Sequence, residues 1–134
     1  MATLKVSDLS VGDWVQDKNG IYAKVLGMEN WSNGYFLNIE LHGVNVGVTP
    51  LASVLPIPIT AEMLEKSGFE RSKSPFAVYF HADKVWISYD KRSETWSVTI
   101  NINNVAPNLY AKILYIHQLQ HALRLAGLDK EINL

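Results

Sequence analysis

The chain has no cysteine among its 134 residues. This absence excludes disulfides, thiolate-bound zinc, iron–sulfur clusters and thiol catalysis. No apolar run approaches the ~18 residues of a membrane-spanning helix. The first residues also lack the charged and apolar regions of a signal peptide. We therefore expect a cytoplasmic protein that does not enter a membrane.

Charge is scarce and nearly balanced. Charged residues make up 19% of the chain, twelve basic and thirteen acidic, for a net charge of −1. A protein that coats nucleic acid needs a clearly basic surface, and the longest basic run here is Lys91-Arg92. The composition therefore argues against non-specific nucleic-acid binding. A specific contact through a small patch stays open.

Apolar residues, in contrast, are plentiful. Hydrophobic residues make up 48% of the chain, including four Trp, six Tyr and four Phe. This supply is enough to bury a core in one domain of ordinary size or in two very small ones. Disorder is excluded on the same ground.

Residues 1–55 show short extended segments separated by turn residues. Asp17 to Gly20 is a tight-turn signal, and residues 30–34 form a second loop. Apolar residues alternate with polar ones over residues 37–42, and Val44, Val46 and Val48 continue the alternation. This pattern predicts a small SH3-like β-barrel.

Residues 56–134 are expected to form a second part, packed against the barrel. Pro56 and Pro58 make a stiff connector. Thr60 can cap a helix that runs from Ala61 to Ser67. Gly68 can end that helix in the left-handed conformation, which brings Phe69 against Leu64.

Three strands of an antiparallel meander are predicted next, over residues 76–81, 85–89 and 96–101. If Phe80 faces Val85 and Tyr89 faces Trp96, one face of the sheet collects the apolar residues. The opposite face then places Tyr79 beside Trp86, and Trp86 beside Thr99. Either another part of the chain covers these two aromatics or they are exposed.

The last predicted element is an amphipathic helix that begins between Asn108 and Ile113 and ends at Gly127. Its apolar stripe comprises Ile113, Ile116, Leu119, Leu123 and Ala126. We expect this helix and the first one to cover the apolar face of the meander. The fold class is therefore α+β, with a barrel followed by an α-β-β-β-α part.

Three phrases of the sequence resemble a known group of proteins. They are Pro56-Ile-Pro-Ile-Thr60, Glu65-Lys-Ser-Gly-Phe69 and Tyr115-Ile-His-Gln-Leu-Gln-His-Ala-Leu-Arg-Leu-Ala-Gly127. In this order they are similar to a family of small uncharacterised proteins of Bacteroidetes gut bacteria and their phages or mobile elements. The resemblance implies an accessory role in a phage or mobile-element setting and no particular activity.

Two histidines four residues apart, His117 and His121, suggest comparison with the His-Glu-x-x-His helix of zinc proteases. That chemistry needs a carboxylate as general base beside the first histidine. This chain has Gln118 there, and an amide cannot accept a proton from zinc-bound water. We therefore expect no metal at this pair.

Other catalytic patterns are missing as well. The serines lack a Gly-x-Ser-x-Gly setting, and the glycines form neither a Walker loop nor a dinucleotide fingerprint. Asp83 and Asp90 fall in predicted hairpin turns, where Asp commonly binds the backbone. The sequence predicts no enzyme, no catalytic residue and no cofactor.

The candidate binding residues are three aromatics, Trp31, Tyr79 and Trp86, because such side chains are favoured at interfaces and stack on flat ligands. Trp31 is either an anchor at a loop tip or folded back onto the barrel. The leading hypothesis is an interaction module that binds another protein or itself. The alternatives are a small-molecule or nucleotide-binding protein that sequesters its ligand, and a specific nucleic-acid contact through the barrel.

Overall fold

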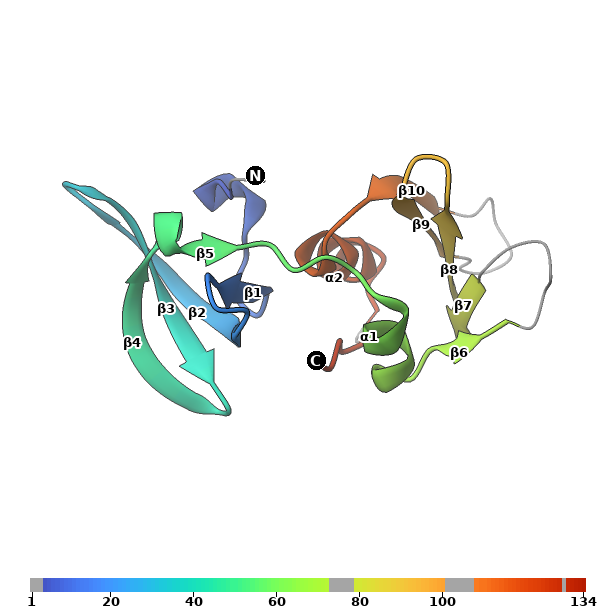
Figure 1. The fold of residues 1–134 in the computed structure, drawn as a ribbon, viewed down its shortest axis with the longest axis horizontal. Coiled ribbons are helices and arrows are strands. Elements are labelled where there is room, and N and C mark those ends of the chain that lie inside the picture. The colour runs from blue at the N-terminus through green and yellow to red at the C-terminus, as the bar shows by residue number, and fades with distance from the viewer. Residues whose placement is uncertain (1–3, 73–78, 101–107, 129) are drawn as a thin grey trace. The chain divides into compact units, whose positions relative to one another are not determined.

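The computed structural model describes residues 4–72, 79–100, 108–128 and 130–134. The chain divides into two compact units, Met1–Ile57 (unit 1) and Pro58–Leu134 (unit 2), coloured blue to green and green to red in Figure 1. The described residues form antiparallel strands and two α-helices. The α+β fold class predicted from the sequence is confirmed.

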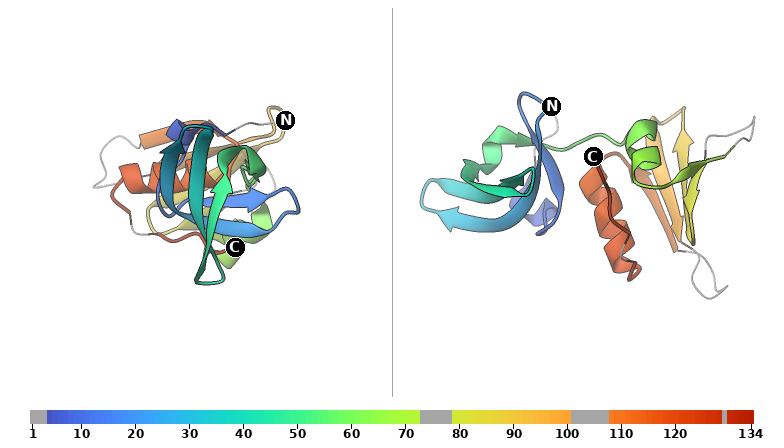
Figure 2. Two further views of the ribbon diagram at one scale, coloured as in Figure 1. Left: turned by 90° about the vertical axis from the view of Figure 1, so that its left-hand side faces the viewer. Right: turned by 90° about the horizontal axis from the view of Figure 1, so that it is seen from below.

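Unit 1 is a five-stranded antiparallel sheet with the strand order β4-β3-β2-β1-β5. Two β-bulges, one between Val25 and Gly27 and one between Ile39 and Glu40, interrupt the pairing. Bulges increase the local twist, and the sheet curls strongly (Figures 1 and 2). Its strands are β1 (Trp14–Asp17), β2 (Tyr22–Trp31), β3 (Gly34–Leu41), β4 (Val44–Pro50) and β5 (Val54–Leu55).

The core of unit 1 lies on the inner side of this curl. Ile39, Leu41 and Leu51 pack against a cluster of buried residues, which comprises Leu4, Leu9, Val15, Ala23, Val25, Leu37 and Val54. The predicted turn after β1 is confirmed, because Asp17 Oδ1 accepts from the backbone N–H groups of Asn19 and Ile21 at 2.8 and 2.9 Å.

The valines of β4 do not continue the buried alternation of β3, which corrects the sequence prediction. Val44, Val46 and Val48 are 61%, 50% and 45% exposed. The bulge opposite Ile39 and Glu40 leaves Val46 without a cross-strand partner. Because a one-residue shift moves side chains to the other face, Val48 lies on the face away from the core.

Unit 2 contains a second five-stranded antiparallel sheet, in the order β10-β9-β8-β7-β6. Its strands are β6 (Glu70–Arg71), β7 (Tyr79–Ala82), β8 (Val85–Asp90), β9 (Thr95–Ile100) and β10 (Asn108–Ile113). Helices α1 (Ala61–Lys66) and α2 (Ile116–Leu125) lie on the same side of this sheet (Figures 1 and 2). Phe80, Ile87 and Val98 are fully buried in neighbouring strands, as expected for a covered apolar face.

The ends of α1 follow the predicted chemistry. Thr60 accepts a hydrogen bond from the backbone N–H of Met63 at 3.3 Å. Gly68 has φ +91°, and the N–H of Phe69 donates to the carbonyl of Leu64 at 3.0 Å. Leu64 and Phe69 are both buried. Local capping groups therefore fix this helix at both ends.

The register between β7 and β8 differs from the predicted one. Phe80 pairs with Ile87 rather than with Val85, and the turn is the tight Asp83-Lys84 connection closed by Ala82 and Val85. Asp83 has φ +50°, which Asp tolerates better than most residues. Between β8 and β9 the predicted pairs are confirmed, including Tyr89 with Trp96. Phe76 and Val78, which were expected on the same sheet, lie outside the described residues.

The beginning of the last helix was also predicted wrongly. Residues 108–113 form strand β10, which pairs with β9, and α2 begins only at Ile116. The chain leaves the sheet through a bulge after Tyr110, where Lys112 has φ +59°. The meander therefore has more strands than the three expected. The end of the helix at Gly127, with φ +73°, is as predicted.

Gln118 explains why α2 begins where it does. Its Oε1 accepts from the backbone N–H groups of Leu114 at 2.9 Å and Tyr115 at 3.1 Å. These bonds satisfy amides just ahead of the first turn, as the third residue of a capping box does. We expect Gln118→Ala to lower the free energy of unfolding by about 1 kcal/mol. Urea unfolding followed by circular dichroism measures the change, and Gln118→Glu should retain most of the stability.

Candidate binding surface

Large apolar side chains are exposed mainly on strands β2 to β4. Thirteen large hydrophobic residues of the described chain are exposed, and nine of them fall between residues 21 and 48. They are Ile21, Tyr22, Leu26, Met28, Trp31, Tyr35, Val44, Val46 and Val48. Contiguous apolar surface marks an interaction site more often than scattered single residues do, so the strand pairing decides which of these residues lie together.

The pairing of the strands gathers part of this set on the outer face of the sheet. Phe36 lies between Glu29 on β2 and Pro50 on β4, and Trp31 pairs with Gly34 at the end of the hairpin. Because side chains alternate along a strand, these residues and Val48 lie on the face opposite the buried Leu37. We call Glu29, Trp31, Phe36, Val48 and Pro50 the hairpin patch.

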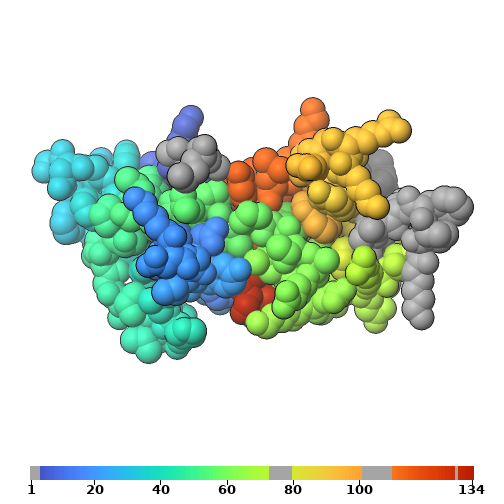
Figure 3. All heavy atoms as spheres, viewed as in Figure 1, coloured from blue at the N-terminus to red at the C-terminus, as the bar shows by residue number. Residues whose placement is uncertain are grey.

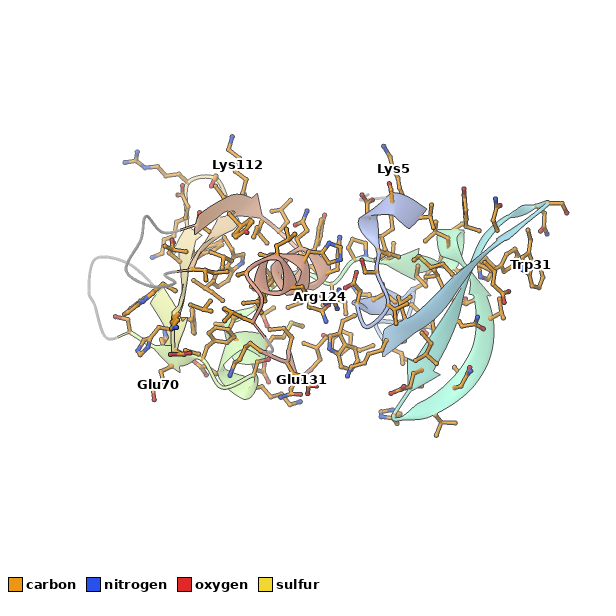
Figure 4. The ribbon with its side chains drawn as sticks, turned by 180° about the vertical axis from the view of Figure 1, so that it is seen from behind. Lys5, Trp31, Glu70, Lys112, Arg124 and Glu131 are labelled. Carbon is orange, nitrogen blue, oxygen red and sulfur yellow. The ribbon has the colours of Figure 1, made fainter. Side chains whose placement is uncertain are left out.

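Trp31 is held in a defined position within the hairpin patch. Its ring lies 4.5 Å from the ring of Phe36, centroid to centroid, with a tilt of 30°. Its Nε1–H donates to Glu29 Oε2 at 2.9 Å. The side chain is nevertheless 49% exposed. Figure 4 shows it beside the β2–β3 hairpin, at the margin of unit 1, and the same hairpin end is the cyan projection in Figure 3.

The charges nearest the hairpin patch along the chain are carboxylates. Residues 25–57 contain the carboxylates of Glu29 and Glu40 and no Lys or Arg. Glu40 pairs with Lys24 in register, and the ammonium of Lys24 lies 5.0 Å from the ring centroid of Trp14. The only cation of β2 to β4 on this outer face, Lys24, therefore lies near the beginning of β2, whereas Glu29 and Trp31 lie at the other end of that strand.

Of the two other predicted aromatics, Trp86 is 45% exposed on the outer face of the second sheet. It pairs with Thr99 as predicted, but its partner on β7 is His81, whose ring stacks on it at 4.7 Å. His81 Nε2 also lies 3.7 Å from Glu70 Oε2. Tyr79 pairs with Ser88 instead of lying opposite Trp86, and the placement of its side chain lies outside the described residues. The predicted Tyr79–Trp86 cross-strand pair is therefore wrong.

His117 and His121 lie 5.9 Å apart, ring centroid to ring centroid, in an edge arrangement. His117 is buried and stacks near the ring of Tyr115 at 5.9 Å. The described residues contain no group of three His, Asp or Glu side chains that could hold a metal ion. Gln118, which occupies the position of the missing general base, is bonded to the backbone instead.

A shallow groove runs between β10 and α2, with a volume of about 460 Å³. Its lining combines apolar side chains with Tyr110, Lys112, Gln118 and His121. The volume is within the usual range for small-ligand sites. Lys112, however, extends away from the helix in Figure 4, so its ammonium does not converge with the other polar groups.

The carboxyl of Asp90 forms a hydrogen bond within the turn that follows β8. Its Oδ1 accepts from the backbone N–H of Arg92 at 2.9 Å, and this bond lowers the pKa of Asp90 below the ordinary value. A lowered pKa stabilises the folded turn at neutral pH, and that contribution is lost as the pH falls through the folded pKa. The predicted role of Asp90 in binding the backbone is confirmed.

The residues missed by sequence reasoning are the partners of Trp31. Glu29 lies two residues before Trp31 on the same strand, whereas Phe36 reaches the indole only because the turn between β2 and β3 has two residues, with Trp31 and Gly34 as the closing pair. The Asn33-Gly34 phrase contained a signal for a short hairpin. Because the predicted loop covered residues 30–34, the sequence analysis did not pair Trp31 with any residue of the next strand.

Comparisons with protein-family models, with curated proteins and with solved structures gave no match. In the described part of the chain, neither α1 nor α2 nor any other helical stretch has the length and apolar character needed to cross a bilayer.

Proposed function

We propose that this protein is a non-enzymatic interaction module that binds a protein partner through the hairpin patch. The observation that carries the proposal is Trp31. Its ring is fixed by Phe36 and Glu29 and is still half exposed. A Trp that is held in position loses little conformational freedom when a partner covers it, and this is why Trp is common among residues that dominate binding energy.

Several finer expectations belong to the same proposal. We interpret the curled sheet of unit 1 as an SH3-like barrel, with unit 2 as the second part of this α+β module. We place the protein in the cytoplasm, in an accessory role for a phage or mobile element, as its resemblance implies. Support for a binding role comes from the exposed apolar residues that share the outer face of β2 to β4, Trp31 and Val48.

Affinity capture from a lysate of the native host tests this function by comparing the proteins that three baits retain. The full chain and its Trp31→Ser variant serve as bait, with Trp86→Ser as the matched control because Trp86 is similarly exposed. We expect a specific protein to be retained by the wild type and by Trp86→Ser. Trp31→Ser should weaken its retention at least about tenfold, since truncating an anchor residue costs about 2 kcal/mol or more. Equal retention by all three baits would refute the role of the hairpin patch.

A second candidate function, small-molecule or nucleotide binding, is favoured by the groove between β10 and α2. A thermal-shift screen against nucleotides and other small metabolites examines it. A ligand at about 100 times its dissociation constant should stabilise the fold by about 2.7 kcal/mol. A stabilisation that Leu125→Ala reduces, at an exposed residue of the groove lining, would place the ligand in the groove, whereas unchanged melting temperatures across the panel would remove this function.

A further inference from the structure

We propose that the hairpin patch recognises an arginine side chain of the partner, with the guanidinium stacked on Trp31 and paired with Glu29. This inference rests on the proposed function, because it specifies the chemistry of the group that the same surface binds. It goes further by assigning a cationic subsite to two particular side chains.

The ring of Trp31 has the arrangement of a one-sided cation site. Phe36 lies against the ring at 4.5 Å, and the N–H edge is occupied by its hydrogen bond to Glu29. Because the side chain is 49% exposed despite these contacts, solvent reaches much of the ring. Trp is the aromatic residue that attracts cations most strongly.

There is also space beside the ring. The residue that pairs with Trp31 on β3 is Gly34, and apart from Gly34 and its two chain neighbours no described atom lies within 4 Å of the position that a Cβ would occupy there. A side chain at this position would stand on the same face as Trp31. The glycine therefore leaves the outer face open where an arriving side chain would lie along the indole.

Glu29 supplies the charge for this subsite. The indole N–H that it accepts is neutral, so the bond orients the carboxylate without cancelling its charge. Among the described residues, Glu29 makes no ion pair, and no Lys or Arg occurs from residue 25 to residue 57. Lys24, near the beginning of β2, lies over the ring of Trp14, and no cation of the described strands pairs with Glu29.

The ring of Trp31 and the carboxylate of Glu29 together favour one kind of side chain as the occupant of this subsite. A guanidinium is planar and stacks on an aromatic face while its N–H fork reaches a carboxylate, which an ammonium does less well. Nucleic acid would bring phosphates towards Glu29 and Glu40. A purely apolar segment would cover Glu29 without compensating the charge, which is unfavourable. Arginine is the side chain that satisfies both the ring and the carboxylate.

The test uses the full chain labelled with ¹⁵N and two blocked tripeptides, acetyl-Val-Arg-Val-amide and acetyl-Val-citrulline-Val-amide. Citrulline keeps the shape of arginine and removes its charge. We expect the indole N–H signal of Trp31, identified by its absence in Trp31→Phe, to shift on titration with the arginine peptide. The arginine peptide should bind about tenfold more tightly than the citrulline peptide, as expected for a cation–π contact combined with an exposed ion pair.

Two controls make the result specific to this subsite. The indole signal of Trp86 in the same sample should stay nearly unmoved, because among the described residues no carboxylate accepts from its indole N–H, as Glu29 accepts from that of Trp31. Glu29→Gln should remove most of the preference for arginine, whereas Glu40→Gln should leave most of it. Raising the salt from about 0.05 to about 0.5 M should weaken arginine binding through screening.

Equal shifts with both peptides, or no shift of the Trp31 signal, would overturn the arginine subsite. If retention of the partner in the affinity-capture experiment still required Trp31, the proposed interaction module would be kept, and its partner would present a group other than arginine. If retention in that experiment did not depend on Trp31 either, the proposed function would be refuted together with the arginine subsite. A concentration-dependent dimer that Trp31→Phe cannot form would assign the hairpin patch to a second copy of this chain and would overturn the assignment to a separate partner.

Discussion

Replacing Phe80 by Ala is expected to lower the free energy of unfolding of unit 2 by about 3–5 kcal/mol. The ring is fully buried in β7, between the strands that carry Arg71 and Ile87. It lies 6.0 Å from the ring of Trp96, centroid to centroid, and the guanidinium of Arg71 lies 5.9 Å from its centroid. Truncation would leave a cavity in the layer between the sheet and the helices, and a close-packed layer relaxes only partly around such a cavity.

The neighbouring strand offers the control. Trp86→Ala removes an even larger side chain, but from the outer face, where the ring is 45% exposed. We expect it to lower the free energy of unfolding by less than about 1 kcal/mol. Urea unfolding of both variants, followed by far-ultraviolet circular dichroism, gives the comparison. A greater loss for Trp86→Ala than for Phe80→Ala would mean that the two faces of this sheet have been exchanged.

The sequence specified those elements whose signals are local. Thr60, Gly68 and Phe69 define α1 because capping depends on backbone groups only a few residues away. Strands β8 and β9 alternate cleanly, and the Asp90 turn between them fixes their register. Unit 1 was likewise expected as short strands, and its tight turn at Asp17 follows from side-chain bonds to the backbone.

The errors arose where the outcome depends on a distant partner. The last helix was expected to begin between Asn108 and Ile113, but residues 108–113 add to the edge of the sheet beside β9. Val48 looked like a core residue because a bulge in the pairing with β3 cannot be read from alternation alone. The register of β7 on β8 changed by two residues because the turn between them was expected to be longer.

The same limit applied to the binding surface. Trp31 could be selected from the sequence because large aromatics are common at interfaces. Its ring neighbour Phe36 can be identified only once the hairpin register is known, and Glu29 only once residues 29–31 are known to be strand rather than loop. The open position at Gly34 depends on that register as well. Composition could therefore suggest a binding protein, but it could not define a cation subsite.

The second large effect is expected within this hairpin, where Leu37→Ala should lower the free energy of unfolding of unit 1 by about 2–5 kcal/mol. Leu37 is fully buried in the core cluster and pairs with Met28 on β2 and Thr49 on β4. Unit 1 is small, so such a loss is a large part of the stability that a domain of this size has. Unfolding in urea, with tryptophan fluorescence as the signal, measures the change.

Met28→Ala is the matched control, because Met28 lies directly opposite Leu37 but is 37% exposed. We expect a loss of less than about 1 kcal/mol from this variant. Comparable losses from the two variants would show that the hairpin is packed along its whole length, with no projecting end left to bind a partner. A large loss from Leu37→Ala alone would place the boundary between core and binding surface within this hairpin, since Trp31 lies only three residues beyond Met28 on β2.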